Sequence, residues 1–89
     1  MTPRTAAKVD ANQREIVAAL RRIGATVQCL HMVGHGCPDL LVGWHGENIL
    51  LEVKTPNGDL TPDELDWHAA WQGEVNIVRS VQDALECLR

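Results

Sequence analysis

Two short apolar segments, residues 39–44 and 48–54, are separated by only three residues, 45–47. A connection of this length between two strands predicts an antiparallel hairpin, and Gly46 suits the sharp turn that a hairpin needs. A hairpin brings the start of its first strand beside the end of its second. This feature constrains the chain most, because it decides which side chains meet at the open end.

Three charged residues stand at that open end. Asp39 begins the first strand, and Glu52 and Lys54 end the second. Side chains alternate between the two faces of a strand, so Glu52 and Lys54 share a face and Val53 points to the other. Charges in an apolar run are costly unless they are paired or bind a metal ion. Two carboxylates and an ammonium group are therefore expected to converge at one edge of the sheet.

The segment before the hairpin predicts a helix and a strand. The helix should cover about residues 7–23 and end at Gly24. A strand over residues 25–32 and a glycine- and proline-containing loop over 33–38 should follow. Apolar residues at helical spacing mark the buried face of the helix: Val9, Ile16, Val17, Leu20 and Ile23.

The segment after the hairpin begins a second helix with a complete start signal. Thr61 can cap it, Pro62 fits its first position, and Glu64 can close a capping box. Gly73 should end this helix, residues 75–78 should form a short strand, and a last helix should follow. Strands 48–54 and 75–78 are joined by a helix, so they should be parallel. The order αβββαβα predicts an α/β fold, with a mixed β-sheet flanked by helices.

Length and composition limit the chain further. Its 89 residues allow one domain, residues 1–89. No apolar run is long enough for a membrane span, and no secretory signal is visible. Three cysteines without a framework spacing predict reduced thiols in the cytoplasm.

The net charge of −4 has the wrong sign for a broad grip on nucleic acid. Bound divalent cations would cancel part of it where a phosphate must sit. The basic residues are also concentrated near the N-terminus, although an ordinary solvated helix would explain that equally well. Five of the eight lie there: Arg4, Lys8, Arg14, Arg21 and Arg22.

The charged set at the hairpin end suits phosphodiester hydrolysis. Asp39, Glu52 and the carbonyl oxygen of Val53 could bind Mg²⁺ or Mn²⁺, because Mg²⁺ prefers hard oxygen ligands. A bound metal ion activates water and stabilises charge on the phosphate. Lys54 could orient the water or stabilise the transition state. The alternative for a bare Glu-x-Lys is a salt bridge at a strand end.

The motifs around Asp39, Glu52 and Lys54 resemble those of a known family. Residues 36–41, Gly-Cys-Pro-Asp-Leu-Leu, followed by residues 51–55, Leu-Glu-Val-Lys-Thr, resemble the PD-(D/E)XK nucleases. Within this superfamily the sequence resembles the small phage-type VRR-NUC domains, which are similar to Holliday-junction resolvases. The resemblance extends over nearly the whole chain. It implies a restriction-endonuclease-like fold and a DNA endonuclease acting on branched or structured DNA.

The resemblance also implies further site residues. Glu15 is the candidate for a metal ligand on the first helix, and an exposed acid is its alternative. The sequence departs from the family pattern at Asp59, where a basic residue is common, at Glu64, where Gln is usual, and at His68, where an aromatic residue is usual. Glu64 could bring a carboxylate to the site. The favoured interpretation is a capping box turned away from it. The candidate DNA contacts are Arg14, Arg21, His35, Glu64 and His68.

Two other groups of residues have side chains that could bind a ligand. The first contains four potential zinc ligands within nine residues, but their spacing matches no familiar zinc motif. These residues are Cys29, His31, His35 and Cys37. The second is Trp67 and Trp71, four residues apart on the second helix, which could stack on bases. Packing against the sheet or a partner subunit is the simpler interpretation.

The expected partners follow from this interpretation. We expect DNA, a second copy of the chain in a homodimer, and no membrane. A helicase or another replication or recombination protein is a candidate partner. The expected location is the cytoplasm of a prokaryotic or phage-infected cell. The alternative function is a non-catalytic DNA-binding or assembly module that keeps the nuclease fold.

Overall fold

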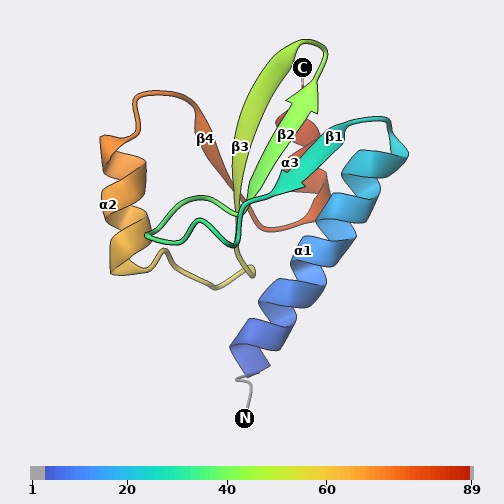
Figure 1. Ribbon diagram of the computed structural model, residues 1–89. Coiled ribbons are helices and arrows are strands. Elements are labelled where there is room, and N and C mark those ends of the chain that lie inside the picture. Colours follow the sequence, from blue (N-terminus) through green and yellow to red (C-terminus); the bar gives the residue numbers. More distant parts are fainter. Residues whose placement is uncertain (1–3, 89) are drawn as a thin grey trace.

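The computed structural model describes residues 4–88, and their side chains from Asp10 onward. The strands form one four-stranded sheet. Figure 1 shows α1 and α2 on opposite sides of this sheet. The element order αβββαβα agrees with the prediction. The elements are α1 (Arg4–Arg22), β1 (Thr26–Cys29), β2 (Leu40–Trp44), β3 (Glu47–Val53), α2 (Pro62–Ala70), β4 (Val75–Val78) and α3 (Val81–Glu86).

The sheet has the order β1-β2-β3-β4, and it is mixed as predicted. β1 pairs antiparallel with β2, β2 pairs antiparallel with β3, and β3 pairs parallel with β4. His45 and Gly46 alone form the turn of the hairpin, with φ angles of 48° and 81°. Two positive φ values are typical of a two-residue type I′ turn. Glu47, expected in the turn, instead pairs with Trp44 and starts β3.

The core lies between the sheet and the helices α1 and α3. Among its members are Ile16 and Leu20 of α1, which are fully buried. The prediction for Ile23 is wrong, since its side chain is 46% exposed. α1 ends at Arg22, and Gly24, at φ 99°, turns the chain towards β1 before Ile23 can face the core. Val9, also expected in the core, lies outside the described side chains.

The loop before β2 starts earlier than expected, because β1 ends at Cys29. The amide of Leu30 donates to the carbonyl oxygen of Asp39 at 2.8 Å, which closes the intervening loop. Gly36 in this loop has φ 82°, and a Cβ there would overlap the backbone of Asp63 in α2. Glycine is therefore required at this position, and the loop that leads to Asp39 packs directly against the start of α2.

α2 differs from the other helices because none of its residues is buried. Its predicted start is confirmed: Thr61 is the N-cap, Pro62 follows, and Glu64 completes the capping box. The helix ends at Ala70, before Gly73, and the amide of Trp71 still donates to the carbonyl oxygen of Trp67 at 3.0 Å. In the described part of the chain, no helix has the length and apolar character that crossing a bilayer requires.

Candidate active site

The two acidic residues of the hairpin meet at its open end. Leu40 pairs with Leu51, so the next step of the same register places Asp39 opposite Glu52. The amide of Val53 donates to Oδ2 of Asp39 at 2.7 Å, which holds this carboxylate against β3. Glu52 is 1% exposed. Its Oε2 atom is buried and has no hydrogen-bond partner among the described residues.

The environment of Glu52 favours its neutral form while no cation is bound. Burial, and then the neighbouring carboxylate of Asp39, raise the pKa of Glu52 to about 9, while Lys54 acts in the opposite direction. Burial, followed by the charges of Glu52 and Asp39, also raises the pKa of the Cys37 thiol. A negative charge on Glu52 is therefore unfavourable beside Asp39 unless a cation offsets it, as expected where a metal ion belongs.

Lys54 forms an ion pair with α2. Its Nζ lies 2.6 Å from Oε1 of Glu64, and both side chains are largely buried. The same Oε1 accepts a hydrogen bond from the amide of Thr61 at 2.8 Å. Although partial burial pushes the pKa of Glu64 upward, the hydrogen bonds from Lys54 and Thr61 hold it below its ordinary value. Glu64 is therefore an ionised partner of Lys54.

This ion pair corrects one expectation about Glu64. The capping box is present, but the interpretation that it turns Glu64 away from the site is wrong. The first turn of α2 faces the end of β3, so one carboxylate can both cap the helix and bind Lys54.

His68 makes the second contact between α2 and the site. Its Nε2 lies 3.2 Å from Oε1 of Glu52. His68 follows Glu64 by four residues, so the two side chains lie on one face of the helix. In this structure the two candidate DNA contacts on α2 are therefore engaged with Lys54 and Glu52. Both are positions at which the sequence departs from the family pattern.

Asn12 and Arg79, which the sequence did not single out, support the backbone around Lys54. The side-chain amide of Asn12 donates to the carbonyl oxygens of Lys54 at 2.9 Å and of Arg79 at 3.1 Å. Nη1 of Arg79 donates to the carbonyl oxygens of Thr55 at 2.8 Å and of Gly58 at 2.6 Å. The single signal in the sequence was Asn12 itself, since asparagine is a weak helix former in a helix interior.

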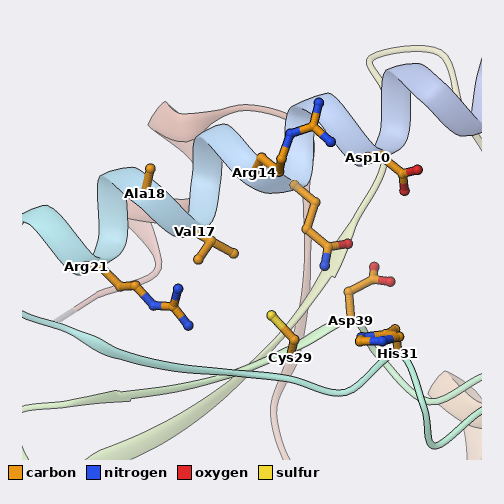
Figure 2. A pocket seen from close by; sticks show the side chains of 9 residues that line it. Asp10, Arg14, Val17, Ala18, Arg21, Cys29, His31 and Asp39 are labelled. Carbon is orange, nitrogen blue, oxygen red and sulfur yellow. The ribbon is translucent and has the colours of Figure 1, made fainter.

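The remaining candidate residues fall into two groups. Arg14 and Arg21 line a groove between α1 and β1 that also contains Asp39 (Figure 2). Glu15 is exposed and is not among the groove residues, and the acid of α1 that shares the groove with Asp39 is Asp10. The structure therefore does not bring Glu15 to the carboxylate pair. His35 lies elsewhere, beside Trp67 of α2.

The carboxylate pair fits a hard divalent cation. Mg²⁺ is often held by one or two carboxylates with water completing its octahedron. Asp39 and Glu52 offer that donor set, and Oε2 of Glu52 is buried without a partner among the described residues. Within the described part of the chain, no group of three or more His, Cys, Asp or Glu side chains is arranged around a common point.

The same finding bears on the zinc alternative. Cys29 and His31 line the groove beside α1, whereas His35 lies beside α2, so the four candidate ligands do not gather at one point. The structure gives the zinc alternative no support.

These features define an α/β domain in which a hairpin presents an acidic pair and a lysine at one end of a mixed sheet. The chain is similar to a solved VRR_NUC domain, with a TM-score of 0.73 and 26% sequence identity. The match covers 89% of this chain and 91% of that chain. No protein-family model and no curated protein matches the sequence. The predicted resemblance is confirmed: the fold is the restriction-endonuclease-like fold of VRR-NUC domains, which are PD-(D/E)XK nuclease domains.

Replacing Glu64 by glutamine tests what the ion pair does. The glutamine side chain can still accept a hydrogen bond from Thr61, so the capping box should survive. The loss of one negative charge beside Lys54 should tighten DNA binding in EDTA by about threefold, as one phosphate contact would. The metal concentration needed for half-maximal cleavage should also change.

The matched control is Asp63→Asn, which removes the same charge from the same helical turn without touching Lys54. Fluorescence anisotropy and a metal titration of cleavage measure both effects. If the two variants behave equally, Glu64 has no specific role in the active site.

Proposed function

We propose that this chain is a divalent-metal-dependent endonuclease that hydrolyses phosphodiester bonds of branched or structured DNA. The observation that carries the proposal is the buried Glu52, whose Oε2 has no partner among the described residues, opposite the half-buried Asp39 and near Lys54 on a VRR-NUC fold. The resemblance to junction resolvases supports branched DNA as the substrate.

The residues of the site divide the work. Asp39 and Glu52, with the carbonyl oxygen of Val53, would hold Mg²⁺ or Mn²⁺. When bound, such an ion lowers the pKa of a water molecule and offsets charge on the phosphoryl oxygens. The hydrogen bond from the Val53 amide keeps the Asp39 carboxylate oriented. Lys54 stabilises negative charge that grows on the phosphate, and for this its Nζ must leave or share its contact with Glu64.

Cleavage of a supercoiled plasmid and of a four-way junction tests this function. Each substrate is incubated with the protein over a range of Mg²⁺ or Mn²⁺ concentrations, with EDTA as the control. We expect metal-dependent cleavage that is faster on the junction than on a linear duplex of the same sequence. DNA binding without cleavage at any metal concentration would instead favour the non-catalytic module, in which Glu64 keeps Lys54 neutralised. Equal cleavage rates on the junction and the duplex would support endonuclease activity but contradict a preference for branched DNA.

We also propose that the protein acts as a homodimer that uses α2. Trp67 and Trp71 stack with their ring centroids 4.6 Å apart. Trp71 is 48% exposed and Leu65 is 55% exposed, so α2 presents apolar surface to solvent. A two-fold pair of active sites would suit symmetric cleavage of a branched junction.

Light scattering at micromolar concentration should therefore give the mass of two chains. Trp71→Glu should shift the protein to the mass of one chain, because a buried charge at an apolar interface is costly. Ala70→Glu is the comparison variant, because it adds the same charge to α2 without removing a large apolar side chain. A single-chain mass for the parental protein, with and without DNA, would overturn the proposal.

A further inference from the structure

A groove of about 700 Å³ runs between α1 and β1 and includes Asp39 of the acidic pair. Figure 2 shows Asp10, Val17 and Arg21 along the side of α1 that faces Cys29, His31 and Asp39, whereas the guanidinium of Arg14, at the rim of the groove, is directed away from them. The spacing of seven and four residues places Asp10, Val17 and Arg21 on one face of the helix. The groove therefore continues directly from the proposed active site.

The charges along the groove change sign. Asp10 and Asp39 lie towards the end that contains the active site, whereas Arg14 and Arg21 follow towards the C-terminal end of α1. Val17 and Ala18 give the wall between the arginines an apolar character. An anion could approach the acidic end only when a cation is bound, but it could approach the arginines at any time. This arrangement of two arginines with an apolar wall between them fits a ligand that has several negative charges and apolar parts.

The geometry of the two arginines fits a nucleic-acid strand. Nη2 of Arg21 donates to the carbonyl oxygen of Val27 at 3.1 Å, which holds the guanidinium over the groove. A guanidinium has five N–H donors, so others remain for a phosphate. Arg14 stands at the rim, exposed. At 1.5 Å per residue, the two Cα atoms are about 10 Å apart along the helix. Measured along the axis of a DNA duplex, this is the rise of about three base pairs of 3.4 Å each.

We propose that this groove binds the sugar–phosphate backbone of the DNA strand that is cut, with Arg14 and Arg21 contacting phosphates on one side of the scissile bond. The inference rests on the proposed nuclease function and extends the same site. Arg22, the next residue of α1, is also basic and exposed but does not line the groove.

Anisotropy of a fluorescein-labelled duplex in EDTA, measured over a series of salt concentrations, tests the proposal. Arg14→Ala and Arg21→Ala should each raise Kd about three- to tenfold and reduce the slope of log Kd against log salt by about one. The matched control, Arg22→Ala, removes the same charge from the same helix and should change Kd by less than about twofold. Equal effects of all three variants would show that DNA is attracted by the overall positive charge of the helix, and would contradict DNA binding in the groove.

A second pair of variants adds a charge at alanine residues, whose side chains form no hydrogen bond or ion pair. Ala18→Glu puts a negative charge into the groove, and Ala70→Glu puts the same charge on exposed α2. We expect Ala18→Glu to weaken DNA binding at least fivefold more than Ala70→Glu, with unchanged circular dichroism for both. Equal binding by the two variants would overturn the proposal even if Arg21→Ala failed to fold.

The groove and the nuclease function can fail separately. DNA binding that depends on Arg14 and Arg21, without cleavage at any Mg²⁺ or Mn²⁺ concentration, would support DNA binding in the groove and contradict the endonuclease activity. If the protein cleaves DNA but its Arg14 and Arg21 variants bind DNA as Arg22→Ala does, the endonuclease activity would be supported and DNA binding in the groove contradicted. A labelled acidic peptide that binds as tightly as the duplex, with the same dependence on Arg21, would show that the groove recognises protein and overturn the proposal.

Discussion

Glu52→Gln is expected to abolish metal-dependent cleavage and, at the same time, to stabilise the metal-free protein at neutral and alkaline pH. The side chain keeps its size and can keep its contact with His68, but it loses the charge that a cation would bind. Changes around a metal site, even one shell away from the ion, typically cost 10- to 100-fold in activity or metal affinity. The loss of a ligand should therefore exceed about 100-fold.

The stability effect follows from the raised pKa of Glu52. Its pKa lies at about 9 in the folded chain, compared with 4.5 as its ordinary value. A raised folded-state pKa contributes stability that is fully present below the unfolded pKa and is lost as the pH rises through the folded pKa. Stability should therefore fall between about pH 4.5 and pH 9, by up to about 1.4 kcal/mol per pH unit. A glutamine side chain has no proton to lose, so this contribution to the pH dependence should disappear in the variant.

Thermal melts in EDTA from pH 5 to pH 9 measure this effect. A change of about 1 kcal/mol moves the melting temperature of a small domain by about 4 to 8 °C. We expect Glu52→Gln to melt at least about 5 °C above the parental protein at pH 8, with little difference near pH 5. The matched control is Glu15→Gln, which alters an exposed acid on α1 and should change neither the melts nor cleavage. A lower melting temperature for Glu52→Gln across the whole range would contradict the burial argument.

Asp39→Ala and Asp39→Asn should both abolish cleavage, yet differ in stability. Either change removes one carboxylate of the acidic pair, so the loss of activity should again exceed about 100-fold. The asparagine variant still offers an oxygen to the amide of Val53, whereas the alanine variant leaves that amide without its 2.7 Å partner. An unsatisfied buried donor costs about 1 to 3 kcal/mol. Only the alanine variant should therefore lose that stability.

Urea unfolding and the plasmid assay together test this pair of variants. Asp59→Ala, which changes an acid of the exposed loop after β3, serves as the comparison for removal of a charge. Cleavage at the parental rate by either Asp39 variant would refute the site. Equal stability of the two variants would show that the hydrogen bond to Val53 contributes little.

Much of the fold could be predicted because its signals are local. The short connection before Glu47, with a glycine that tolerates positive φ, specifies a tight hairpin. Thr61, Pro62 and Glu64 start a helix through contacts within a single turn. The alternation of side chains placed Glu52 and Lys54 on one face and Val53 on the other. These patterns were also sufficient to bring Asp39 to the same end of the sheet.

The contacts of α2 with the site could not be predicted, because they join residues that are distant in sequence. Glu64 satisfies its capping box whether or not Lys54 is near, so its second partner depends on where the helix docks. The sequence marked Glu64 and His68 only as departures from a family pattern. Their contacts with Lys54 and Glu52 exist because the loop at Gly36 and the start of α2 pack closely together.

The acidic residues of α1 show the same difference between what local sequence signals determine and what tertiary packing decides. The sequence by itself determined that the helix forms and that Ile16 and Leu20 face the core. Burying those two side chains sets the rotation of the helix about its own axis. Each residue is turned about 100° from the one before it. Glu15, although adjacent to Ile16 in the chain, is therefore carried to the solvent side, while Asp10 lines the groove beside Asp39. Only the docked position of the helix against the sheet could decide which of the two acids reaches the site.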